Sequence, residues 1–307
     1  MITRFFNTSK PIHIIIITFF TLIVFVITSI SNIGDELSFN LLFKEFSKYG
    51  IILISIFTLT FLVRKNKLTN NNSFELLVYG FLLSSLPISM QDSNVLISNF
   101  FILLALRRII SLRSNLKTKK KLFDAAFWIA IASLFYFWAI LFFVLIIMAV
   151  LLYSLAHFKN WIIPFIGVLV VVLITMSYSI VVYGNFDVIF NYLETTSLNF
   201  SGYNIKPLVY QISIIVILSL WPLFFYMINL KRKQKTSRPA HILIFIAFLI
   251  GAAIIIIAPQ KNGSEFLFVF SPLAIIIANY LESIKKYRIS EFYVWLLILT
   301  PVVLLML

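Results

Sequence analysis

The sequence predicts an all-α integral membrane protein that crosses the bilayer about eleven times. Apolar residues make up 61% of the 307 residues and charged residues only 12%, and the mean hydropathy is +1.03. A water-soluble surface needs roughly a quarter of its residues charged, so a soluble domain is excluded. The chain has no cysteine, which excludes disulfides and thiolate metal sites. It also has no glycine-rich phosphate loop, so nothing in it indicates nucleotide binding.

Ten apolar stretches are candidates for the spans. A helix needs about 20 residues to cross the roughly 30 Å of hydrocarbon in a bilayer. The stretches cover residues 11–30, 49–63, 74–90, 95–112, 122–158, 161–183, 207–230, 240–258, 265–281 and 291–307. The fifth is almost twice as long as one span requires, so we expect a hairpin that turns at the aromatic cluster Phe135 to Trp138. The hairpin brings the predicted spans to eleven, in a single membrane domain over residues 1–307.

Loop charge predicts the orientation of these spans. If the N-terminus is cytoplasmic, the C-terminus is outside, and all but four of the 25 bases lie in cytoplasmic loops; the four are Lys44, Lys48, Lys206 and Lys261. A single helix over 122–158 would move the bases of 231–238 outside and break the positive-inside rule. The net charge of +14 therefore indicates topology and contact with anionic membrane lipid, not nucleic-acid binding.

We expect the first span to be an uncleaved membrane anchor. Arg4 and Lys10 precede it, as in a signal peptide, but no small-residue cleavage site follows it. The chain shows no organellar transit features and is rich in Asn, Lys and Ile, which is typical of AT-rich genomes. We therefore predict a multi-pass protein of a bacterial inner (cytoplasmic) membrane.

Two predicted outer loops are longer than ordinary connectors. In 31–48, apolar residues alternate with charges at helical spacing, which predicts a short amphipathic helix lying on the bilayer surface. That helix would hold the adjacent acids Asp35 and Glu36 at headgroup depth, although acids beside a span are also commonplace. The second loop, 184–206, is either a lid or binding surface or a plain solvated connection.

A third feature of the outer side is the tight turn between the third and fourth spans. It carries Asp92 on the same side of the membrane as Asp35. A carboxylate there is a candidate for chemistry. The alternative is that Asp92 or Ser93 caps the helix that follows, since both residue types are favoured at that position.

The order of these features resembles the GT-C class of membrane glycosyltransferases. The closest pattern is that of protein O-mannosyltransferase and aminoarabinose transferase relatives, whose first outer loop carries an Asp-Glu pair; here the pair is Asp35-Glu36. The resemblance covers residues 1–206 as a GT-C-like module, with outer loops 31–48 and 184–206, and leaves four additional spans in 207–307. The outer loops lack His and Arg, which departs from the class. We also expect the chain to belong to an uncharacterised bacterial family of multi-pass proteins.

The resemblance implies transfer of a sugar from a polyprenyl-phosphate donor to an acceptor on the outer, periplasmic face. Asp35 would act as general base or orient the acceptor hydroxyl. Glu36 and Asp92 would position the acceptor or bind a divalent cation, Mg or Mn. The predicted substrate-binding residues are Lys206, Lys261, Tyr203 and Glu194, and one of the two lysines would offset the charge of the leaving phosphate.

Two other function classes stay open. A transporter of a small or lipid-linked solute fits the size of the chain, but its spans contain almost no charge away from their ends. A non-enzymatic inner-membrane scaffold would use the bases of 107–121 as a cytoplasmic patch for lipid or an acidic partner, or those bases are a topology signal alone. The three histidines, His13, His157 and His241, show no paired spacing for a metal site.

Overall fold

The computed structural model describes residues 2–33, 38–155, 157–184, 195–284 and 286–306, and these are helical with no strand among them. The α-helices are α1 (Ile2–Phe6), α2 (Pro11–Ile33), α3 (Phe39–Asn66), α4 (Phe74–Ser85), α5 (Ser93–Ile110), α6 (Thr118–Phe135), α7 (Phe143–Leu152), α8 (Phe158–Tyr183), α9 (Lys206–Asn229), α10 (Arg238–Ile257), α11 (Leu267–Ser283) and α12 (Tyr287–Met306). Short 3-10 turns join several of them: η1 (Pro87–Met90), η2 (Ser111–Ser114), η3 (Phe137–Phe142), η5 (Ser201–Tyr203), η6 (Leu230–Arg232) and η7 (Ser264–Phe266).

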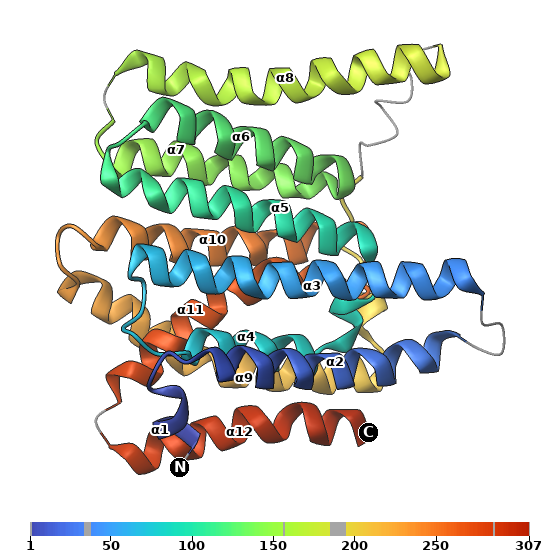
Figure 1. Ribbon diagram of the computed structural model, residues 1–307, viewed down its shortest axis with the longest axis vertical. Helices are drawn as coiled ribbons and strands as arrows, with labels where there is room; N and C mark the ends of the chain where they lie inside the picture. The colour runs from blue at the N-terminus through green and yellow to red at the C-terminus, as the bar shows by residue number, and fades with distance from the viewer. Residues whose placement is uncertain (1, 34–37, 156, 185–194, 285, 307) are drawn as a thin grey trace.

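Most of the long helices run side by side along one direction, with α8 at one edge of the bundle and α12 at the other (Figure 1). In the described chain, eight helical segments are long and apolar enough to cross a membrane. The segment around α11 is 94% buried, whereas that of α8 is only 17% buried. Every residue of α4 is buried as well. Helices α4 and α11 thus form the centre of the bundle, and α8 presents apolar side chains to the surroundings, as a lipid-facing helix does.

Residues 122–158 form two helical elements, as their length predicts. Helix α6 ends at Phe135, Tyr136 takes an extended conformation, and η3 and α7 lead back along α6 (Figure 1). The helices beyond residue 206 join the same bundle, because α11 contacts α4 and α10 contacts α7. The total of eleven spans and their orientation remain predictions.

The prediction of a separate surface helix after the first span is wrong. Helix α3 runs without a break through 28 residues, and it begins at Ser38, whose side chain accepts a hydrogen bond from the Leu41 amide. Two of the charges that suggested a surface helix pair within α3, where Lys48 contacts Glu45 one turn earlier. At about 1.5 Å per residue, α3 is longer than the hydrocarbon thickness of a bilayer, so its first turns extend past the apolar region.

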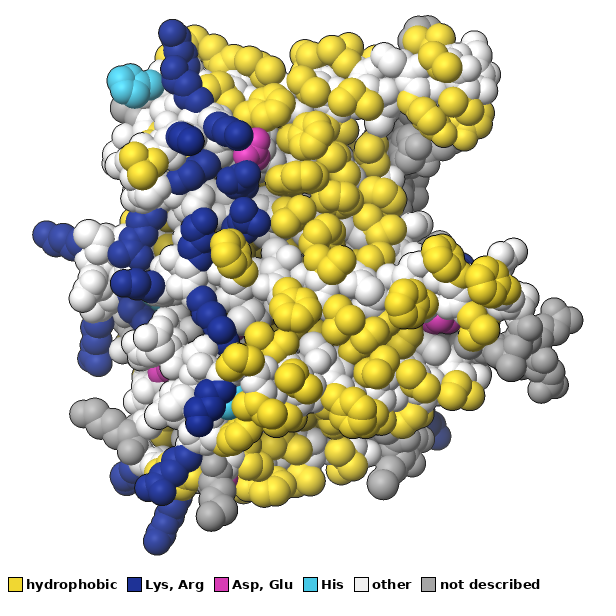
Figure 2. Space-filling view, viewed as in Figure 1, with side chains coloured by type: hydrophobic (Ala, Val, Ile, Leu, Met, Phe, Trp, Pro, Cys, Tyr) yellow, Lys and Arg dark blue, Asp and Glu magenta, His cyan; other side chains and the backbone are white. Residues whose placement is uncertain are grey.

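Lysine and arginine side chains gather at one end of the bundle, next to a broad apolar surface (Figure 2). We call this the basic end; it includes the bases of residues 64–67, 107–121 and 231–238. The opposite end carries Lys48, Lys206 and Lys261. A boundary between charge and apolar surface of this kind is expected where a protein leaves the bilayer.

Candidate functional site

The predicted catalytic acids are only partly described. Asp35, Glu36 and Glu194 lie outside the described residues. Asp92 is half-buried and is the N-cap of α5: its Oδ1 accepts hydrogen bonds from the amides of Asn94 (2.9 Å) and Val95 (3.2 Å). The capping alternative is therefore the role that the geometry gives to Asp92.

Two of the predicted substrate-binding residues, Tyr203 and Lys261, lie close together at the opposite end. The buried ammonium of Lys261 donates to the carbonyls that end α10, those of Ile255 (3.2 Å), Ile256 (2.6 Å) and Ala258 (3.1 Å). It also lies 4.6 Å from the ring centroid of Phe200. An ammonium has three donors, and these carbonyls take all three. Burial lowers the pKa of Lys261.

Tyr203 donates its hydroxyl hydrogen bond to Glu265, a residue that the sequence did not single out. Burial, followed by the neighbouring Glu265 carboxylate, raises the pKa of Tyr203. The other carboxylate oxygen of Glu265 accepts the Gly263 amide at 3.0 Å. Gly202 lies so close to the loop that contains Lys261 that a Cβ at position 202 would lie 2.3 Å from the Lys261 carbonyl oxygen. These contacts join two loops and fix the end of α10.

Lys206 is separate from this junction. It is the first residue of α9 and its side chain is exposed. Another cluster at this end of the bundle is also internally paired: buried Lys48 contacts Glu45, and Glu45 accepts a 3.0 Å hydrogen bond from Ser29. Gln91 joins the same cluster through a 3.1 Å bond to Thr28. At the opposite end, then, buried Lys48 pairs with an acid, and the donors of buried Lys261 are taken up by carbonyls within the fold.

The basic end has a pocket of about 600 Å³ between the ends of α3 and α5, the turn η2 and the start of α6. Seven bases line it: Lys65, Lys67, Arg107, Arg108, Arg113, Lys117 and Lys121. Among the described residues, only one of the seven has an ion pair, Arg108 with Asp124 at 3.0 Å. Like charges held around one concave surface repel one another unless an anion neutralises them.

Several of these bases are held in place by contacts that leave their charge uncompensated. The Lys121 ammonium donates to the Ser111 carbonyl (2.5 Å) and to the Ser114 hydroxyl (2.7 Å). Lys65 and Arg107 lie over the Phe61 ring, 5.2 and 4.9 Å from its centroid. Aromatic and neutral partners orient a cation without cancelling its charge.

The backbone around this pocket is unusual. Three of the four non-glycine residues with positive φ in the described chain occur here, Lys67, Asn115 and Lys117, each with φ of 51°. The first two end helices, where this conformation is common, although glycine or asparagine usually adopts it. Lys117 instead starts α6 and makes no side-chain cap. Helix α6 thus begins at a residue that lines the pocket, and a helix N-terminus favours anions.

An apolar groove adjoins the basic pocket. Its lining is Ile14, Phe57, Thr60, Phe61, Arg64 and Lys65, and its volume is about 460 Å³. Lys65 lines both the basic pocket and the apolar groove. Phe61 lines the groove, and its ring contacts the Lys65 ammonium of the basic pocket. Polar and apolar surfaces thus meet at a single point on α3.

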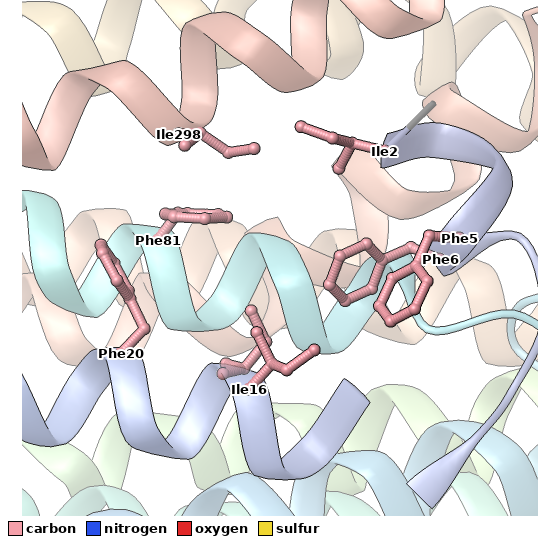
Figure 3. Close-up of a pocket in the computed structure, with 8 residues that line it drawn as sticks. Ile2, Phe5, Phe6, Ile16, Phe20, Phe81 and Ile298 are labelled. Carbon is pink, nitrogen blue, oxygen red and sulfur yellow. The ribbon is translucent and has the colours of Figure 1, made fainter. Parts of the chain in front are cut away.

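A separate hollow of about 470 Å³ lies between α1, α2, α4 and α12 (Figure 3). Phe5 and Phe6 stand at one side of it, and Phe20 and Phe81 at the other. All of its lining side chains are apolar, so it offers van der Waals contact and no group for acid-base or ionic chemistry.

The described residues include no group of three or more His, Cys, Asp or Glu that could hold a metal ion. A divalent cation therefore remains tied to the prediction for Asp35 and Glu36. Neither the curated proteins nor the solved structures include a match to this chain. Residues 6–306 match a family of unknown function, DUF6427, and the chain belongs to that family.

Proposed function

We propose that this membrane protein binds a lipid whose phosphate-bearing headgroup occupies the basic pocket. The observation that carries the proposal is the pocket itself: seven bases line about 600 Å³, and one described acid pairs with one of them. The proposed function is therefore that of a lipid-binding membrane protein without a catalytic role at this pocket.

The donors of the pocket suit phosphate. Arg107 and Arg113 supply planar guanidinium groups, which bind phosphate oxygens through two parallel hydrogen bonds, and Lys117 supplies a point charge. The amides at the start of α6 supply further donors. Together they match a ligand with several anionic oxygens better than a single carboxylate.

The adjoining groove favours a lipid over a soluble phosphate. Phe57 and Phe61 of α3 are exposed and line this groove, which shares Lys65 with the basic pocket. A lipid whose headgroup lies beside Lys65 can lay its chain against them. A lipid chain there gains van der Waals contact with the protein and anchors the headgroup beside the pocket, which a soluble anion cannot do.

A matched pair of double variants tests the proposal against the alternative that these bases serve only to orient the protein in the membrane. Lys65→Gln/Lys117→Gln removes two charges that line the pocket. Lys119→Gln/Lys120→Gln removes two exposed charges from the same end that do not line it. With about 1 kcal/mol lost for each phosphate contact, we expect the first pair to weaken binding about tenfold or more and the second to leave it nearly unchanged.

The measurement is lipid binding by native mass spectrometry, with phosphatidylglycerol or cardiolipin against phosphatidylcholine. Inorganic pyrophosphate is the soluble competitor. Displacement of lipid by pyrophosphate at equal concentration would point to a soluble anion, and equal loss in the two double variants would reduce the pocket to general surface charge. Added salt should weaken the binding of the anionic lipids.

The sugar transfer implied by the GT-C resemblance stays a prediction. It rests on Asp35 and Glu36, and Asp35→Asn in membranes, assayed with a polyprenyl-phosphate sugar, tests it. Of its other residues, Asp92 caps a helix and Lys261 binds carbonyls. Lys206 is thus the predicted phosphate-binding residue whose side chain is exposed.

A further inference from the structure

Glu75 has a setting unlike that of the other carboxylates described in the chain. It is the second residue of α4, its side chain is fully buried, and neither carboxylate oxygen has a hydrogen-bond partner on another described residue. Glu282, by contrast, accepts hydrogen bonds from the Asn70 amide (2.8 Å) and from the side chain of Asn72. Glu265 is bonded by Tyr203.

The surroundings of Glu75 supply no counter-charge in contact with it. Helices α2, α3, α9, α11 and α12 pack against α4. The charged residue of α9, Lys206, is exposed at the first position of that helix. Among the described residues, Arg64 of α3 acts on Glu75 from a distance and makes no ion pair with it, while Glu282 of α11 has the same sign. Glu291 of α12 is bonded to α1. His13 of α2 binds Ser73 instead.

An ionised carboxylate cannot rest in such a place at low cost. Burying an unpaired charge costs several kcal/mol even after the protein relaxes, and buried polar groups are almost always hydrogen-bonded. The neutral acid avoids the larger part of that cost. Ionisable groups buried in membrane proteins are commonly the groups that carry protons.

We propose that Glu75 is a proton-binding site, which carries a proton while α4 is packed in the bundle. Release breaks the carboxylic O–H bond and hands the proton to water, so the charged form needs water or the Arg64 guanidinium to reach it. Because α4 is buried throughout, loading and release of this proton are linked to opening of the packing around its first turn.

Polar groups also lie beside the start of α4, two residues before Glu75. Ser73 immediately precedes α4, and its hydroxyl lies 3.0 Å from His13 Nδ1 and 3.5 Å from the Thr8 carbonyl. The second ring nitrogen of His13 is buried and has no partner in the described residues. A chain of exchangeable groups thus leads from the start of α4 toward the loop before α2.

Infrared spectroscopy of the full chain in lipid tests the proposal, because a protonated carboxyl gives a C=O stretch that a carboxylate lacks. We expect such a band at neutral pH in the wild-type protein. Glu75→Gln should remove it, and Glu75→Asp should shift it because the acid is retained. Glu282→Gln, which changes a hydrogen-bonded carboxylate near the same end, should leave it unchanged.

Two results would overturn the proposal: a wild-type spectrum with no protonated-carboxyl band at neutral pH, or a band that Glu75→Gln leaves intact. If Glu75→Gln does not fold, the shift in Glu75→Asp decides, since an unshifted band assigns the proton to another residue. Lipid binding at the basic pocket is measured separately, so either proposal can fail alone.

Discussion

The two ends of the bundle use charge in different ways. At the opposite end, the buried bases are neutralised or bound within the fold: Lys48 pairs with Glu45, and Lys261 is taken up by three carbonyls. At the basic end, seven bases surround one pocket and a single ion pair offsets them among the described residues. A buried base that is enclosed by its partners is a structural element, whereas a base that lines a hollow and has no acid beside it can still meet an anionic ligand.

This difference reverses the expectation for the predicted site. The sequence pointed to the outer loops, where acids and lysines are few and conspicuous. Each base of the pocket at the basic end, taken singly, could be explained by the usual excess of Lys and Arg in cytoplasmic loops. The concave shape of the pocket, with Lys67 and Lys117 in unusual backbone conformations, is what topology does not explain.

The largest expected effect is the loss of stability in Lys261→Met. The substitution leaves the carbonyls of Ile255, Ile256 and Ala258 without their buried donor. Hydrogen bonds from a charged group contribute about 1.5–3 kcal/mol, so we expect the free energy of unfolding to fall by about 3 kcal/mol. Thermal melting of the purified protein in detergent measures this.

Lys206→Met is the matched control for that substitution. It removes the same charge from the same end, but its side chain is exposed, and surface substitutions usually change stability by less than about 0.5 kcal/mol. Equal melting temperatures for the two variants would contradict a structural role for Lys261 and return it to the candidates for ligand binding.

A smaller effect is expected for Tyr203→Phe. Removing the hydroxyl leaves a buried oxygen of Glu265 without its donor, which costs about 1–3 kcal/mol. The pKa of Tyr203 is raised in the fold, so the stabilisation is present below the usual tyrosine pKa of about 10 and declines as pH rises beyond it. Thermal melting from neutral to alkaline pH should show a steeper decline in the wild type than in Tyr203→Phe.

Glu265→Gln separates the two causes of that pH dependence. Glutamine keeps an acceptor for the Tyr203 hydroxyl but removes the negative charge that adds to the raised pKa. We expect a milder alkaline decline than in the wild type. A decline of identical steepness in all three proteins would mean that Tyr203 does not titrate in this junction.

Much of the fold could be predicted from composition and length. Residues 122–158 exceed one span, and the loop charges require a turn, which the structure places at Tyr136. The surface helix failed because an amphipathic pattern has the same period in a separate surface helix and in the first turns of a longer one. The unbroken course of α3 from Phe39 to Asn66 distinguishes the two.

The sites were harder to predict for a related reason. Lys65 and Lys117 are distant in sequence, so their convergence on one pocket depends on the packing of α3 against α5 and of α5 against α6. Glu75 looked like an ordinary acid near a helix start. Its burial follows from the packing of five other helices against α4, which no local sequence pattern indicates.

The smallest expected effect distinguishes a cap from a catalytic acid at Asp92. Asp92→Ala removes the acceptor for the Asn94 and Val95 amides, and loss of such a cap costs about 1 kcal/mol. Asp92→Asn keeps an acceptor at the same place, so its melting temperature should stay close to that of the wild type. If Asn proves as harmful as Ala, the negative charge itself matters, and Asp92 becomes the first described carboxylate at the opposite end with a role beyond holding the fold.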